Sequence, residues 1–118
     1  MVTIAFHKDI TLEKWASKPV SWQVLSIASE MGRAETSLKS RLPEPFRASL
    51  ERTLELIDLT VEANLTNGEF VREMLRFREV LAGVYVDGLS TDVDDFRCLT
   101  KVLLTLEPEA YNLLGVTF

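Results

Sequence analysis

Four acidic residues in the middle of the chain have the spacing of one face of a helix. Glu51, Glu55, Asp58 and Glu62 follow one another at intervals of four, three and four residues, which places them along a single ridge of an α-helix. Carboxylate oxygens are the ligands that Mg²⁺ prefers, and carboxylates on facing helices hold metal ions in all-helical enzymes. The chemistry that this ridge could support is therefore metal-dependent hydrolysis, with further carboxylates supplied by a second subunit.

Within this ridge, Glu55 and Asp58 resemble the carboxylate pairs of all-α nucleotide pyrophosphohydrolases, a resemblance that implies a nucleotide substrate. A structural interpretation competes with it. If the chain folds back on itself at residues 66–68, Glu62 faces Arg72 and Asp58 faces Arg76. Each such exposed ion pair is worth about 0–1 kcal/mol, but together the pairs neutralise the ridge. We favour the ion-pair interpretation over a metal site and expect no cofactor.

Few residues remain for other kinds of chemistry. The chain has one cysteine, Cys98, and one histidine, His7, which are too few for a structural zinc site. Apolar neighbours predict that Cys98 is a small buried residue rather than a nucleophile. The acidic run at residues 92–95 lacks the glycine and glutamate of a calcium loop, and we expect it to form the first turn of a helix.

The composition fits one folded domain of 118 residues, 47% of them hydrophobic. The net charge is −5 and the pI about 4.9, which disfavours nucleic acid as a partner because its phosphates are anionic. No apolar run has the length of a membrane span or of a signal peptide. We therefore expect a cytoplasmic protein that binds neither nucleic acid nor membrane.

Apolar residues recur every three or four positions through most of the chain, which is typical of amphipathic helices. The clearest example is the stripe of Val20, Val24, Ile27, Met31, Ala34 and Leu38. The predicted stripe of the segment 67–86 is Phe70, Met74, Phe77, Leu81 and Val84, and that of the segment 91–107 is Phe96, Leu99, Leu103 and Leu106. Short connections between such helices favour an antiparallel four-helix bundle. The predicted single domain has an extended arm at 1–8, a short helix at 11–17, main helices at 19–40, 45–65, 67–86 and 91–107, and a short helical turn at 108–114.

Aromatic and apolar residues remain at both ends of the chain after these stripes are paired. Val2, Ile4 and Phe6 alternate with other residues, as in a strand, and a lone strand needs a partner. Aromatic side chains are enriched at the centres of interfaces. We therefore expect a non-enzymatic interaction module that forms a homodimer or another homo-oligomer, or binds an unidentified protein. The candidate interface residues are Val2, Ile4, Phe6, Trp15, Trp22, Tyr85, Tyr111 and Phe118.

Overall fold

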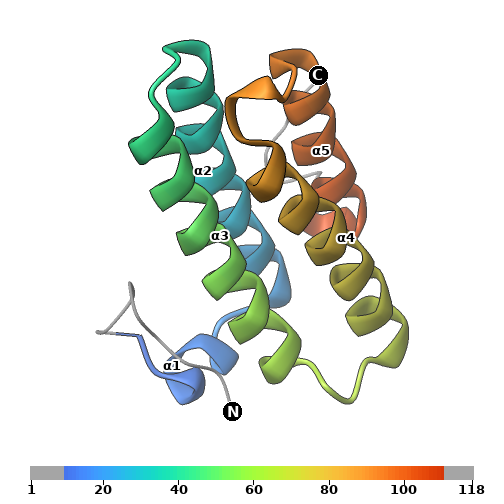
Figure 1. Cartoon of the computed structure of the whole chain (residues 1–118). Helices are drawn as coiled ribbons and strands as arrows, with labels where there is room; N and C mark the ends of the chain where they lie inside the picture. The colour runs from blue at the N-terminus through green and yellow to red at the C-terminus, as the bar shows by residue number, and fades with distance from the viewer. Residues whose placement is uncertain (1–9, 111–118) are drawn as a thin grey trace.

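A computed structural model of the chain describes residues 10–110, and this part is all-helical (Figure 1). The prediction of an all-α fold is therefore confirmed. The helices are α1 (Leu12–Ala16), α2 (Val20–Lys39), α3 (Pro43–Ala63), α4 (Gly68–Asp87), the 3₁₀ helix η1 (Gly88–Ser90) and α5 (Val93–Thr105). Residues 108–110 are also helical. The predicted arm at 1–8 and residues 111–114 of the predicted last turn lie outside the described residues.

The helix starts follow from side chains that bond free backbone N–H groups. Thr11 Oγ1 accepts from the N–H of Lys14 at 3.1 Å and caps α1. Asn67 caps α4 in the same way. Asp92 caps α5, accepting from the next two acidic residues of the run 92–95 at 2.9 and 3.1 Å. The acidic run thus begins a helix as predicted, although Asp92 itself is the cap.

Helix α3 begins two residues before the predicted start at Pro45. Pro43 and Pro45 both lie in its first turn, where a residue without an N–H group loses no helical hydrogen bond. The two prolines therefore belong to the first turn of the helix. The reversal of the chain occurs at Arg41, whose φ of 58° is left-handed.

Helix α2 provides the centre of the core. Five residues of its predicted stripe are fully buried, and Val20 at its start is half-buried. Both α3 and α5 pack against α2, whereas α4 packs against α3. All five predicted apolar residues of α4 are also buried, namely Phe70, Met74, Phe77, Leu81 and Val84. The helical periodicity of these two segments therefore predicted their buried faces correctly.

The buried face of α5 differs from the predicted stripe. Phe96 and Leu103 are buried as expected, and Leu104 is buried as well. Leu99 and Leu106, which belong to the predicted stripe, are half-buried. The reason is that α5 packs mainly on α2, so its core-facing side is rotated toward Leu104 and away from α4.

A buried polar network joins α1, α2 and the end of α3. Trp15 Nε1 donates to Thr60 Oγ1 at 3.0 Å, and Gln23 Nε2 donates to the carbonyl of Trp15 at 3.0 Å. Asn64 Nδ2 donates to Gln23 Oε1 at 2.9 Å. A buried polar group left without a partner would cost about 1–3 kcal/mol, so these bonds fix the position of the short helix α1.

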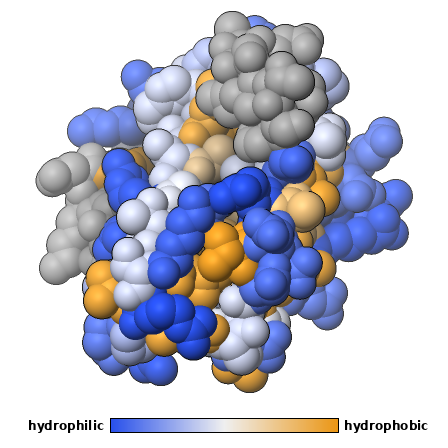
Figure 2. All heavy atoms as spheres, turned by 90° about the horizontal axis from the view of Figure 1, so that it is seen from above, coloured by the Kyte–Doolittle hydropathy of each residue, from blue (hydrophilic) through white to orange (hydrophobic). Residues whose placement is uncertain are grey.

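The opposite end of the molecule is closed by η1. Half-buried Leu89 packs against the core, and its carbonyl accepts from Arg41 Nη1 at 2.6 Å. Figure 2 views the molecule from this end and shows hydrophobic atoms at the centre with hydrophilic atoms around them. The core is thus bounded at both ends by short helical segments held by hydrogen bonds.

Gly32 has no packing role in α2. An added Cβ on Gly32 meets nothing within 4 Å, so no neighbouring helix requires a glycine at this position. We predict that Gly32→Ala raises the free energy of unfolding by about 0.5–1 kcal/mol, because alanine costs less backbone entropy in a helix. Chemical denaturation measures the change.

The control for this prediction is Gly88→Ala. Gly88 has a φ of 60°, which an alanine adopts only with strain, so this variant loses stability. If Gly32→Ala were as destabilising as Gly88→Ala, the open environment of Gly32 would be contradicted.

Candidate functional site

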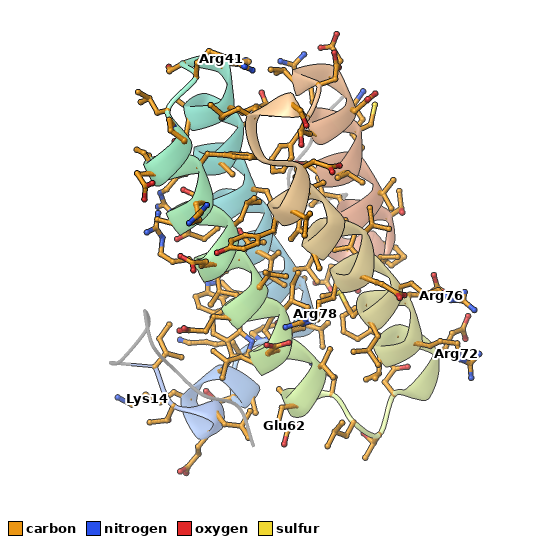
Figure 3. All side chains as sticks on the ribbon, viewed as in Figure 1. Lys14, Arg41, Glu62, Arg72, Arg76 and Arg78 are labelled. Carbon is orange, nitrogen blue, oxygen red and sulfur yellow. The ribbon has the colours of Figure 1, made fainter. Side chains whose placement is uncertain are left out.

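Residues of α4 bond the acidic ridge of α3, but they are not the residues that the sequence predicted. Asp58 accepts from Arg78 Nε at 2.6 Å and from Arg78 Nη2 at 3.2 Å. The predicted pairing of Asp58 with Arg76 is wrong, because Arg76 bonds Glu73 on its own helix at 2.9 Å. Figure 3 shows Arg78 pointing toward α3, and Arg76 pointing away from it.

The helical geometry of α4 explains this difference. Arg76 and Arg78 flank the buried Phe77 on opposite sides, since neighbouring residues are about 100° apart around a helix, and α3 packs on the Arg78 side. The hydrogen bond to Asp58 raises the pKa of Arg78 above its ordinary value. Arg72 also points away from α3 in Figure 3, so the predicted pair with Glu62 does not form.

Glu51, at the start of the ridge, bonds an aromatic side chain. Tyr85 OH donates to Glu51 Oε2 at 3.1 Å, and the guanidinium of Arg47 lies 5.8 Å from the centre of the Tyr85 ring. Partial removal from water raises the pKa of the Tyr85 phenol, and the hydrogen bond to the Glu51 carboxylate adds to the increase. Glu51 thus serves to hold α3 and α4 together.

The ridge residues therefore do not converge on a metal position. Glu55 is buried at 7% exposure, whereas Asp58 and Glu62 are half-buried. Within residues 10–110, no three histidine, cysteine, aspartate or glutamate side chains gather closely enough to hold a metal ion.

A second set of ion pairs joins α2 to its neighbours. Glu30 lies outside the apolar stripe of α2, yet it is 7% exposed and pairs with Arg33 at 2.8 Å and Arg52 of α3 at 3.3 Å. Glu35 pairs with Arg97 of α5 at 3.2 Å. Because α2 has a neighbour on each side, residues on the flanks of its apolar stripe are covered too.

Three candidate interface residues lie in the described part of the chain. Trp15 is buried at 2% exposure and belongs to the core. Trp22 is 42% exposed and packs edge-on against Trp15, with ring centres 5.1 Å apart. Tyr85 is half-buried. The other five candidates, Val2, Ile4, Phe6, Tyr111 and Phe118, lie outside the described residues.

A surface hollow of about 350 Å³ lies beside Trp22. Its walls come from α1, α2 and α3 and include Ile10, Leu25, Leu56 and the Glu30–Arg33 pair. Glu30 and Arg33 are paired with each other, and the Ser26 hydroxyl of the lining donates to the carbonyl of Trp22 at 2.9 Å. This hollow is an apolar recess with a charged edge.

A longer apolar groove runs between α4 and α5, which lie next to each other in Figure 1 but do not pack closely along their lengths. Three hollows of about 410, 150 and 390 Å³ follow this seam, and neighbouring hollows share lining residues. Val80 is 52% exposed and Val102 is 48% exposed. We define the α4–α5 groove by the residues Phe77, Val80, Leu99, Val102 and Leu106.

Acidic residues lie at both ends of the α4–α5 groove. One end hollow is lined by Glu69, Glu73 and Glu107, and the other by Asp87, Asp92 and Asp95. Arg76 lies on the edge of the middle hollow and is paired with Glu73. The groove is therefore apolar along its middle and negatively charged at its ends.

The α4–α5 groove was not predicted from the sequence, and the prediction that Cys98 is buried is wrong. Val80 and Val102 are apolar residues on the flanks of the helical stripes. Apolar residues outside the stripes are the sequence feature that could have indicated the groove. Cys98, predicted to be buried, is exposed on α5, because the core-facing side of this helix is rotated toward α2 and away from Cys98.

Comparison with protein families, characterised proteins and solved structures gives no significant match for this chain. Every helix within the described range 10–110 is too short or too polar to cross a membrane.

We predict that Glu51→Gln lowers the pKa of Tyr85, because it removes a negative charge that opposes ionisation of the phenol. Folding favours the neutral phenol, so the stability that Tyr85 contributes is complete below its ordinary pKa and is lost as the pH rises through the raised value. Ultraviolet absorbance of tyrosinate during alkaline titration measures the change. Tyr85→Phe identifies its signal against that of Tyr111, and an identical titration in Glu51→Gln would contradict the contact.

We also predict that Mg²⁺ leaves the melting temperature unchanged. A ligand that binds only the folded state stabilises it, but Arg78 and Tyr85 already engage two of the ridge carboxylates. Thermal unfolding with Mg²⁺ and with a matched amount of Na⁺ salt tests this. A rise specific to Mg²⁺ that disappears in the double variant Glu55→Ala/Asp58→Ala would restore the metal-dependent hydrolase as the better hypothesis.

Proposed function

We propose that this chain is a non-enzymatic interaction module, an antiparallel four-helix bundle that self-associates as a homodimer or another homo-oligomer in the cytoplasm. The observation that carries the proposal is the exposed apolar surface of the α4–α5 groove, where Val80 and Val102 each leave about half of their area in water. Exposed apolar surface with a polar border is typical of protein interaction sites.

Two features support the antiparallel bundle. The connections between the long helices are short, with residues 40–42 before α3 and 64–67 before α4. The colours in Figure 1 run upward along α2, downward along α3 and upward again along α4. Packing of α2 with α3 and α5, and of α3 with α4, agrees with three edges of a four-helix square.

Energetics favour covering the fourth edge. Fully burying a valine or leucine side chain contributes about 1.5–3 kcal/mol. Because Val80 and Val102 are about half exposed, about half of that free energy would still be gained by covering each of them. Leu99 and Leu106 beside them are half-buried. A partner that covers these four side chains would gain several kilocalories per mole before the entropic cost of association is subtracted.

Light scattering after size exclusion tests self-association directly. We predict a molar mass above the 13.4 kDa of one chain, rising with protein concentration and indifferent to Mg²⁺. It should also persist in high salt, since apolar contacts are not screened. A mass of 13.4 kDa at every concentration would contradict self-association, and a mass that depends on Mg²⁺ would favour the acidic ridge as a site.

A further inference from the structure

We propose that the α4–α5 groove binds the N-terminal arm, residues 1–8, of a second copy of the chain. This inference rests on the proposed self-association and names the surfaces that carry it. The groove offers exposed apolar side chains from two helices. The arm offers Val2, Ile4 and Phe6 at every second position, so that an extended arm places all three on one side.

The dimensions of the two partners agree. From Glu73 at one end of the groove to Asp87 at the other, α4 advances 14 residues, which is about 21 Å at 1.5 Å per residue. An extended chain from Met1 to Lys8 spans about 23 Å. Alternate side chains of the arm are about 6.6 Å apart, which is close to one helical turn of about 5.4 Å.

Charge complementarity favours residues 1–8 over residues 111–118 as the segment that binds the groove. The groove ends are lined by carboxylates, among them Glu69 and Asp87. Residues 1–8 contain Lys8, His7 and no acidic residue, whereas residues 111–118 are apolar but contain no basic residue. Lys8 is therefore attracted to an acidic end of the groove while Val2, Ile4 and Phe6 cover the apolar middle.

The position of α1 indicates that the arm comes from another copy. α1 packs against α3 and lies on the far side of α3 from α4 and α5 in Figure 1. Ile10, where the described chain begins, lines the hollow beside Trp22. Ile10, the first described residue, therefore lies at another surface than the groove. Reciprocal exchange of arms between two copies would give each groove one arm and close a dimer.

Substitutions in the full chain on each side of this contact test the proposal. Ile4→Glu places a charge in the arm, and Val80→Glu places one in the groove. Each should raise the dimer dissociation constant by about 30-fold or more, as expected for the centre of an interface. Val86→Glu is the matched control, since Val86 lies on α4 outside the groove and is 83% exposed. It should leave the constant unchanged.

Mixing the two variants identifies the geometry. Ile4→Glu retains an intact groove and Val80→Glu an intact arm, so the mixture should show a higher molar mass by light scattering than either variant alone. Circular dichroism verifies the fold, and Val102→Glu replaces Val80→Glu if that variant unfolds.

The possible outcomes separate this inference from the proposed function. A wild-type dimer that persists in Ile4→Glu, in the groove variant or in both overturns arm binding while self-association stands. Failure of the mixture to associate overturns arm binding as well, because the intact arm of Val80→Glu should still bind the intact groove of Ile4→Glu. A wild-type chain that is monomeric at every concentration overturns both proposals.

Discussion

The packing of α2 on two sides is the constraint on which the rest of the structure depends. Its stripe from Val24 to Leu38 is completely buried, and covering it requires both α3 and α5. Because α5 is committed to α2, it does not pack closely on α4, which packs against α3 instead. The open groove between α4 and α5 is thus a consequence of how the apolar stripe of α2 is covered.

The ion pairs follow from the same arrangement. Glu30 and Glu35 lie on opposite flanks of the α2 stripe, and they bond Arg52 of α3 and Arg97 of α5 respectively. On the far side of α3, Asp58 and Glu51 bond Arg78 and Tyr85 of α4. Exposed pairs contribute little free energy each, but they oppose rotation of one helix against the next. The acidic ridge that suggested metal chemistry is part of this alignment.

How much the sequence could predict depends on how many neighbours a helix has. The stripe of α4 was predicted residue by residue, because periodicity identifies an apolar face. It does not identify which helix covers that face or its flanks. The burial of Leu104 on α5 was therefore not predicted, Cys98 was wrongly predicted to be buried, and the arginine that pairs with Asp58 was chosen from the wrong flank. The groove could not be predicted for the same reason, since it depends on an edge where two helices do not pack.

The distribution of polar contacts gives the two sides of the molecule different properties. Trp15, Thr60 and Gln23 fix α1 through buried hydrogen bonds that require defined geometry. The middle of the α4–α5 groove has apolar side chains instead, and apolar contacts are not directional. A partner in the groove would gain affinity from Val80 and Val102, whereas its register would have to come from the carboxylates at the groove ends. Charge, rather than apolar area, is therefore the property that distinguishes residues 1–8 from residues 111–118 as occupants of the groove.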